Sequence, residues 1–544
     1  MPARDSDEPP RKIALAAPNE HPPSDRTRDF PGTPVSAPRP VYLDYAATTP
    51  VDPRVVAAMN ACLGVEADFG NAASAHPFGG AAAAHIDRAR EMVAGLIGAA
   101  ADEIVFTSGA TESDNLAILG VARANADRGR HLVTSRTEHK AVLDPCKRLE
   151  KEGFSVTYLT PERSGLIPTA AVAAALRPDT QLVSIMGVNN ETGVLQDLAA
   201  IGAVCRAHGV AFHSDLAQAA GKVPLDVATL PVDVAAFTAH KLYGPKGIGA
   251  LYVRRTARPL LQPLMFGGGQ EANLRPGTLA THQIAGFGAA CELAARELEP
   301  ESARLTALRE RLWRALAELP GTHLNGATAP RVPGILNVSF EGVQGESLVA
   351  GLAELAVSTG AACNSASPEA SYVLRALGRD ARLAASSLRF SLGRYTSETD
   401  IDLAARAVHR EVERLRALSP AAKRPAVPAG WASDAVAGEA VVSGEAGGPQ
   451  AETWVRFHLL VAGDTVKDAR FQALGCPHTL DVARWLCGEL PGRTRAALVP
   501  GTPGEWARVR AVPVEKLGRL LVVEDALRAA QRLWPRAARQ APKR

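Results

Sequence analysis

A lysine between a short apolar run and a glycine-rich segment is the first residue whose context suggests chemistry. The run Phe237-Thr238-Ala239-His240-Lys241 is followed by the glycine-rich residues 243–249. A lysine at the end of a strand can be desolvated, which favours the neutral amine that forms a Schiff base. Lysines on protein surfaces are also common, so this segment alone leaves both interpretations open.

Three further polar positions follow predicted strands. Asp215 could hold the ring nitrogen of a pyridoxal cofactor protonated, or it could cap a helix. The segment 108–113 lies between a strand and a helix, where free N–H groups could bind a phosphate or where a capping box could form. His139 could stack on a cofactor ring or be structural. Together with Lys241, these positions raise the prospect of a pyridoxal-phosphate site.

The elements that position these residues are predicted from hydrophobic patterning between residue 41 and about residue 420. Short β-branched runs alternate with helical periods, which predicts a mostly parallel sheet covered by helices. In such sheets ligands bind at the carboxyl ends of the strands. Expected strands are 103–106, 131–134, 155–159, 182–188, 210–213, 234–237 and 250–253, and helical stretches include 88–97 and 113–122.

Composition excludes several classes of protein. The 544 residues carry 60 Lys+Arg against 57 Asp+Glu, a net charge of +3, which gives no electrostatic reason to expect nucleic acid or a membrane surface as partner. No apolar run approaches the ~18 residues of a membrane-spanning helix. The seven cysteines include no CxxC pair. We therefore expect a soluble protein of the reducing cytoplasm.

The flanking regions differ in character from this central unit. Residues 1–40 are rich in proline and are predicted to be a disordered leader. Residues 421–453, rich in Ala, Gly, Pro and Ser, are predicted to be a linker. In residues 454–544 we expect a hairpin of strands 454–461 and 467–471, turned at 462–464, and helices at 480–487 and 524–533.

Eight segments, in order along the chain, carry a family resemblance. They are YLDYAATTP at 42–50, GNAAS at 70–74, FTSGATESDN at 106–115, TEHKAVLD at 137–144, VNNETG at 188–193, HKLYGPKG at 240–247, RPGT at 275–278 and SSLRFSLG at 386–393. Residues 41–420 thereby resemble the cysteine desulfurases of iron-sulfur cluster assembly, members of the class V branch of pyridoxal-phosphate enzymes. The resemblance implies the α/β fold type I of pyridoxal-phosphate transferases, with a large, mostly parallel sheet domain and a smaller α/β domain.

The resemblance also implies a role for each matching residue. Lys241 matches the Schiff-base lysine, Asp215 the partner of the ring nitrogen, and His139 the histidine that stacks on the ring and handles protons. Gln218 matches the donor to the cofactor's phenolic oxygen. The phosphate would be bound by Ala110, Thr111, Thr238 and His240, with Thr278 contributed by the second subunit of a homodimer; Asn190 and Arg389 would hold the substrate carboxylate, for which a guanidinium is chemically suited.

Two motifs depart from the family's usual pattern. The family has Ser-Gly-His-Lys where this chain has Thr-Ala-His-Lys at 238–241, and Asp-Ala-Thr-Gln where it has Asp-Leu-Ala-Gln at 215–218. The first keeps a hydroxyl and the second keeps the acid and the amide. We expect cofactor binding to survive both changes.

Cys363 distinguishes a desulfurase from a transaminase. It lies in STGAACNSAS at 358–367, whose small polar residues predict a mobile loop. Its thiolate could attack the sulfur of a bound cysteine, become a persulfide and deliver the sulfur to an acceptor, or the residue could be incidental. The match to the family's active-site loop favours catalysis. No resident metal is expected, although Cys363 could share in ligating an iron-sulfur cluster during transfer.

The tail resembles a degenerate U-type iron-sulfur scaffold domain, an α+β unit. The matching segments are VKDARF at 466–471, LGCP at 474–477 and VEDAL at 523–527. Only Cys476 remains of the three cluster cysteines, so independent cluster binding is not expected. Cys487, in an apolar helical stretch, is expected to serve packing.

The resemblance thus implies a homodimeric, cytoplasmic, pyridoxal-phosphate-dependent cysteine desulfurase. It would convert L-cysteine to L-alanine and pass sulfur through a Cys363 persulfide to an iron-sulfur scaffold protein, or to acceptors in tRNA or cofactor thiolation. The alternatives are a selenocysteine lyase or another class V aminotransferase, or a chain that serves chiefly as a docking or sulfur-relay platform.

Overall fold

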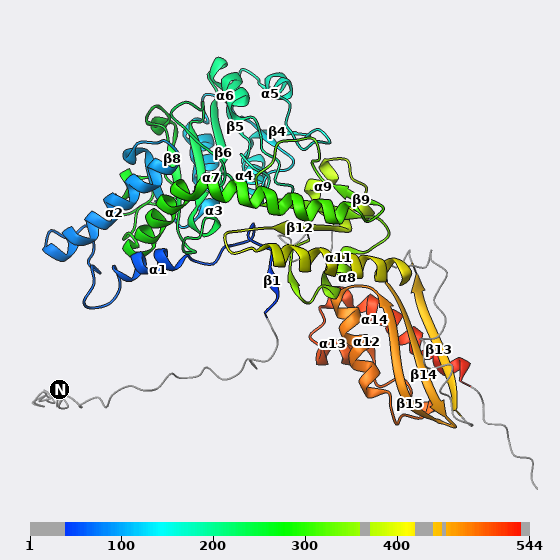
Figure 1. The fold of residues 1–544 in the computed structure, drawn as a ribbon. Helices are drawn as coiled ribbons and strands as arrows, with labels where there is room; N and C mark the ends of the chain where they lie inside the picture. Colours follow the sequence, from blue (N-terminus) through cyan, green and yellow to red (C-terminus); the bar gives the residue numbers. More distant parts are fainter. Residues whose placement is uncertain (1–38, 360–369, 419–438, 449–452, 535–544) are drawn as a thin grey trace, which may run out of the picture. The chain divides into compact units, whose positions relative to one another are not determined.

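The computed structural model describes residues 39–359, 370–418, 439–448 and 453–534 (Figure 1). The predicted leader therefore lies almost wholly outside the described residues, and its disorder stays a prediction. Within the described ranges, no helix combines the length and the apolar character needed to cross a bilayer.

A seven-stranded sheet forms the centre of the large domain. The strand order is β2-β8-β7-β6-β5-β3-β4, and β8 runs antiparallel to both of its neighbours while the other pairs are parallel. All seven predicted strands are found, so the predicted mostly parallel sheet is confirmed. Their bounds are β2 Ile104–Thr107, β3 His131–Ser135, β4 Ser155–Leu159, β5 Thr180–Ser184, β6 Ala211–Asp215, β7 Val234–Thr238 and β8 Gly249–Val253.

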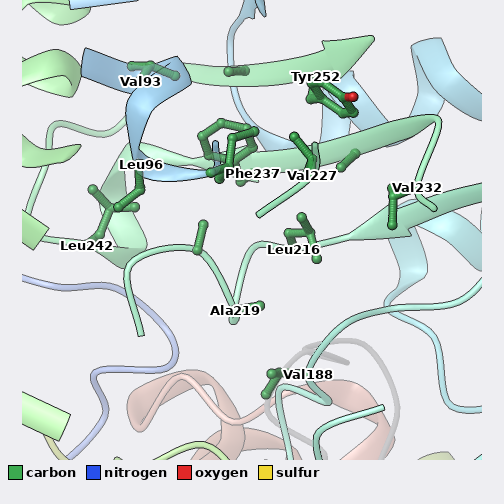
Figure 2. Packing of buried hydrophobic residues seen from close by; sticks show 14 of the residues in the cluster. Val93, Leu96, Val188, Leu216, Ala219, Val227, Val232, Phe237, Leu242 and Tyr252 are labelled. Carbon is green, nitrogen blue, oxygen red and sulfur yellow. The ribbon is translucent and has the colours of Figure 1, made fainter. Parts of the chain in front are cut away.

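The sheet is buried on both faces because helices cover each side. Successive residues of one strand belong to different apolar clusters, because their side chains point to opposite faces of the sheet. Leu132 belongs to one cluster and Val133 to the other. This burial explains why the strands are continuous apolar runs rather than alternating ones. Figure 2 shows part of one of these clusters, which contains Phe237 of β7 and Tyr252 of the adjacent strand β8.

Helices connect the strands and link the two domains. The 37-residue α7 packs on α1 and α2 in the large domain and on α11 in the small one (Figure 1). The helices up to this point are α1 Pro53–Asn60, α2 Pro77–Leu96, α3 Ala110–Ala124, α4 Lys140–Lys151, α5 Thr169–Ala175, α6 Leu198–Ala207 and α7 Thr281–Ala317, with 3-10 turns at Ala101–Glu103, Ala239–Lys241, Arg255–Leu260 and Glu271–Asn273.

The small domain contains a three-stranded antiparallel sheet and a two-stranded parallel pair. Its strand order is β12-β10-β9, and β1 pairs with β11. Because β1 pairs with β11, the first strand of the chain lies beside a strand from residues 355–356. The segment that follows β1 lies next to β12, through a bridge between Asp44 and Ser391. The bounds are β1 Val41–Tyr42, β9 Thr322–Leu324, β10 Ile335–Phe340, β11 Leu355–Ala356 and β12 Ser387–Ser391, with α8 Gly345–Gly351, α9 Tyr372–Ala376, α10 Ala381–Ala385 and α11 Glu398–Leu418.

The tail is an α+β unit with an antiparallel sheet β13-β14-β15. The predicted hairpin is confirmed, because Ala462 pairs with Thr465 across the turn, and both predicted helices are present. The bounds are β13 Glu439–Gly448, β14 Thr453–Ala462, β15 Thr465–Leu474, α12 Pro477–Glu489, α13 Pro503–Val509 and α14 Leu517–Leu533, with 3-10 turns at Arg495–Ala497 and Val514–Lys516.

The predicted linker is too long, because β13 occupies its second half. The glycine content that suggested a linker has a different cause here. A Cβ on Gly444 would lie 2.0 Å from the backbone nitrogen of Ala530 in α14, so the helix can pack on this strand only if residue 444 has no side chain. Composition thus misidentified a close helix–sheet contact as a linker.

Candidate active site

A cavity of about 580 Å³ lies at the carboxyl ends of the large-sheet strands. Of the predicted site residues that the structure describes, all line this cavity except Thr278. These ten come from segments far apart in the sequence: Ala110, Thr111, His139, Asn190, Asp215, Gln218, Thr238, His240, Lys241 and Arg389. The structure therefore brings together residues that the sequence places up to 279 positions apart, from 110 to 389.

Lys241 stands in the short 3-10 turn that follows β7. Its Nζ donates to the carbonyl oxygens of Ala46 and Ala47, at 2.5 and 2.6 Å. The turn is held by the segment after β1, since the Thr49 amide donates to the His240 carbonyl at 2.9 Å. Tyr243 has a φ of 65°, in the left-handed region. Its amide donates to the Thr49 hydroxyl at 2.8 Å. Contacts from residues 46–49 thus set both the backbone turn and the amine.

Asp215 is the last residue of β6 and is buried. Its Oδ1 accepts the Ala217 amide at 2.9 Å, and the chain then turns instead of entering a helix, so it is not a helix cap. Burial raises the pKa of the Asp215 carboxyl, against the opposing effect of the Ala217 bond and of nearby His139 and Lys241. A cation placed beside it would favour its ionised form.

His139 makes a structural contact and also lines the cavity, while its stacking on a cofactor ring stays a prediction. It caps α4, where its Nδ1 accepts the Ala141 amide at 3.2 Å, and it lines the cavity. Burial lowers the pKa of His139, so the neutral imidazole is favoured. A neutral ring can accept and release a proton as required.

The end of the cavity at α3 suits an anion. This 15-residue helix begins at Ala110 after Gly109, which provides no side-chain cap for the first N–H groups. The alternative of a capping box is not found, since Gly109 provides no side-chain cap and Ser113 lies inside the helix, where its hydroxyl oxygen is 2.7 Å from that of Thr107. A Cβ on Gly249 would lie 2.7 Å from the Gly109 Cα, so glycine is required for β8 to pass this close.

Thr238 and His240, which were also predicted to bind the phosphate, line the same cavity. The Thr238 hydroxyl donates to the Ile248 carbonyl at 3.1 Å, and His240 Nδ1 lies 3.1 Å from the Thr48 hydroxyl oxygen. Burial and the neighbouring lysines lower the pKa of His240 to about 4. The ring is therefore neutral near pH 7.

Arg389 of β12 presents a buried guanidinium at another part of the cavity. Its Nη2 donates to Asp44 Oδ1 at 2.7 Å and its Nη1 donates to the Asn190 carbonyl at 2.9 Å. Its Nε is buried without a hydrogen-bond acceptor. A buried donor left without an acceptor fits a carboxylate ligand, which would satisfy it.

Thr278 and Cys363 are the two remaining predicted site residues. Thr278 is exposed and does not line the cavity of its own chain, so a role in a second subunit stays a prediction. Cys363 lies outside the described residues. Among the residues that are described, no group of three or more His, Cys, Asp or Glu side chains is placed to hold a metal ion.

Burial makes the thiols of five of the described cysteines harder to ionise. Cys62, Cys146, Cys205 and Cys291 are buried, and burial raises the pKa of each thiol, to about 12 for Cys146 and Cys205. Burial also raises the pKa of Cys487 to about 12, in line with its predicted packing role.

Cys476 is 1% exposed, and its sulfur lies 3.4 Å from the Thr479 hydroxyl oxygen. The local structure must therefore open before this thiol can take part in a sulfur relay. Such a role stays a prediction.

Sequence reasoning missed three contributors to the site. Asp44 lies within the segment 42–50 but no role was given to it, and the Ala46 carbonyl carries no side-chain signal at all. Lys222 was also missed: its Nζ donates to Gln218 Oε1. Its spacing of four residues from Gln218 was the only available signal.

Comparison with known proteins identifies the family. The model of the aminotransferase class-V family matches residues 41–403. The cysteine desulfurase IscS of Pectobacterium atrosepticum is 56% identical over 382 residues, covering 70% of this chain and 95% of that protein. The IscS of Shewanella woodyi matches to the same extent. The chain therefore belongs to the class V aminotransferase family.

Solved structures agree with this assignment. A NifS-like protein is 36% identical, with a TM-score of 0.63, covering 69% of this chain and 99% of its own. A structure described as SspA in complex with cysteine is 39% identical, with a TM-score of 0.59, covering 66% and 100%. DndA from Streptomyces lividans is 43% identical, with a TM-score of 0.55, covering 65% and 99%.

Proposed function

We propose that this chain is a pyridoxal-phosphate-dependent cysteine desulfurase that converts L-cysteine to L-alanine and retains the sulfur as a persulfide on Cys363. One observation carries the proposal: the Lys241 amine, the buried Asp215 carboxylate and the Arg389 guanidinium line a single cavity. The names of the relatives at 56% identity support the same activity.

The residues present fit pyridoxal phosphate. The uncapped start of α3, with Thr111 and Thr238, suits the phosphate, and the Asp215 carboxylate suits a protonated ring nitrogen. Lys241 is the amine that would attach the cofactor. When bound, the cofactor supplies an electron sink for the carbanion formed at the substrate's α-carbon.

The chain's own residues bind the substrate and handle its protons. Arg389, steadied by Asp44 and the Asn190 carbonyl, holds the carboxylate of the amino acid. Lys241 and the neutral His139 lie in the cavity as the two groups that accept and return protons.

The sulfur step is carried by Cys363. Its thiolate attacks the sulfur of the bound cysteine, so that a sulfur–sulfur bond forms and the carbon–sulfur bond of the substrate breaks. The electron pair of the broken bond stays with the substrate carbon, which takes up a proton and leaves as alanine. No external oxidant or reductant is consumed, because the sulfur is oxidised from the thiol to the sulfane level by the same two electrons that reduce the substrate carbon, whose C–S bond becomes a C–H bond.

The state of the other cysteines supports this choice. Four of the described thiols are buried with raised pKa values, and Cys476 is buried as well. A low-pKa, accessible thiol is what the reaction requires. Cys363, in a segment of small polar residues, is the candidate that sequence provides.

We further propose a cytoplasmic homodimer that passes sulfur to an iron-sulfur scaffold protein or another thiol acceptor. The exposed position of Thr278 is compatible with a contribution to a second subunit's site. The resemblance of the tail to an iron-sulfur scaffold supports a docking role for residues 454–544, and an independent cluster is not expected there because Cys476 is the only one of the three cluster cysteines that remains.

The test is direct. Purified protein supplied with pyridoxal phosphate and L-cysteine should form alanine and one persulfide per active site, located on Cys363 by mass spectrometry. Alanine formed without a Cys363 persulfide would favour a lyase. Transfer of the amino group to a keto acid would favour a transaminase.

A further inference from the structure

A chain of hydrogen bonds connects a second lysine to the catalytic amine. Lys222 Nζ donates to Gln218 Oε1, and Gln218 Nε2 donates to the Ala46 carbonyl at 2.9 Å. Lys241 Nζ donates to the same carbonyl at 2.5 Å. The two amines are therefore joined through one side-chain amide and one backbone oxygen.

The lysine fixes which way the amide faces. A carboxamide has a donor end and an acceptor end, and its neighbours decide their placement. Lys222 Nζ donates to the oxygen of Gln218 and the Ala46 carbonyl can only accept, so the oxygen end of the amide faces Lys222 and its nitrogen end faces Ala46. Its NH₂ group is then directed to the Ala46 side, where Gln218 lines the cavity. Without Lys222, the amide could rotate and present an oxygen to the cavity instead.

The surroundings of Lys222 are consistent with this role. Lys222, Lys241 and Glu301 line a small cavity of about 40 Å³. Glu301 is the nearby acid, while Lys241 and Arg389 repel the Lys222 charge. Burial is the main cause that lowers the pKa of Lys222 to about 7.

We propose that Lys222 is a positioning residue for the reaction: it orients the Gln218 carboxamide so that an N–H donor, not a carbonyl oxygen, faces the phenolic oxygen of pyridoxal phosphate. The inference rests on the proposed function. Lys222 touches neither substrate nor cofactor and acts through Gln218.

The test compares Lys222→Met with wild type in the full-length protein reconstituted with pyridoxal phosphate. The readout is the pH midpoint of the visible absorption band of the bound cofactor, together with its dissociation constant. A donor to the phenolic oxygen favours the form with more negative charge on that oxygen. Its loss should therefore raise the midpoint by about 0.5 to 1 pH unit and weaken cofactor binding about 3- to 10-fold.

A double-mutant cycle shows whether Lys222 acts through Gln218. Gln218→Ala should raise the midpoint in the same direction, and Lys222→Met should add nothing further in that background. Lys151→Met, at an exposed position at the C-terminal end of α4, is the matched control and should equal wild type. Circular dichroism confirms that each variant folds. If Lys222→Met does not fold, Lys222→Gln replaces it. Because the glutamine amide can either donate or accept, this variant should give a smaller shift of the pH midpoint, of the same sign.

Either of two results overturns the inference: an unchanged midpoint in the Lys222 variant, or additive shifts in the double mutant. A wild-type protein that binds no pyridoxal phosphate, or forms no alanine from cysteine, would instead contradict the proposed function itself. The two failures are therefore distinguishable.

Discussion

Replacing Arg389 with lysine keeps a positive charge but removes the forked geometry of the guanidinium. In the structure, Nη2 of that guanidinium donates a hydrogen bond to Asp44 and Nη1 donates one to the Asn190 carbonyl. Its Nε has no hydrogen-bond acceptor. A lysine has one ammonium group and cannot reach all three directions. The variant should keep the contact with Asp44 and lose hydrogen bonds to the substrate carboxylate.

The size of the effect follows from the number of bonds lost. A hydrogen bond to a charged group contributes about 1.5–3 kcal/mol, so losing one of them should raise KM for L-cysteine about 10- to 100-fold. The carboxylate is held equally in the bound substrate and in the transition state. Such uniform binding affects KM more than kcat, so kcat should change by a smaller factor.

The assay is steady-state alanine formation over a range of cysteine concentrations. Arg311→Lys is the matched control, because Arg311 is 43% exposed and pairs with Asp402 and Glu398 on the surface. Its kinetics should match those of wild type. A KM for Arg389→Lys within twofold of wild type, or a fall in kcat at unchanged KM, would refute the assignment of Arg389 to the substrate carboxylate.

Four further variants test other parts of the account. Lys241→Ala should abolish both alanine formation and the visible absorption of bound pyridoxal phosphate; a retained, borohydride-reducible band would identify another lysine. Cys363→Ser should bind the cofactor and cysteine normally, by absorption spectroscopy, yet form no alanine, and undiminished alanine would favour a lyase. Burial lowers the pKa of His213 to about 3, from 6.5. Between these two pH values the unfolded state binds a proton at His213 and the folded state does not. In denaturant titrations of the apoprotein, the stability of wild type relative to His213→Gln should therefore fall by about 1.4 kcal/mol per pH unit as the pH drops below 6.5, and a constant difference would contradict this. Gly444→Ala should destabilise the tail by roughly 1–3 kcal/mol in thermal unfolding, because its Cβ would meet the α14 backbone, whereas the control Gly448→Ala has nothing within 4 Å and should be neutral; equal effects would count against the packing argument.

The strands of the large sheet were predictable because each is a short apolar run of β-branched and aromatic residues. Strand β4 has the predicted bounds Ser155–Leu159. Strand β5 was predicted to reach residue 188 but ends at Ser184. Ile185, Met186 and Val188 are nevertheless buried. Periodicity cannot separate a buried strand from a buried connection that continues it.

The candidate site was predictable in membership but not in its internal contacts. Motifs along the chain identified the residues that line the cavity. They could not reveal that Arg389 pairs with Asp44, 345 positions away, or that residues 46 and 47 accept bonds from Lys241 through backbone oxygens. Such contacts depend on how β1 and β12 fold together, and backbone acceptors have no side-chain signature.

Glycine in the tail shows how one residue type supports opposite predictions. In residues 439–448, glycine and alanine lowered the apparent hydrophobicity and suggested a linker, yet this segment is a strand paired along β14. The absence of a side chain at Gly444 is what lets α14 approach the sheet, where a Cβ would lie 2.4 Å from the Ala526 carbonyl oxygen. The helix then covers an apolar cluster that includes Val455 and Leu527. A glycine-rich segment beside a strongly apolar hairpin is therefore as compatible with tight packing as with a linker, and only the helix that lies against it decides between the two.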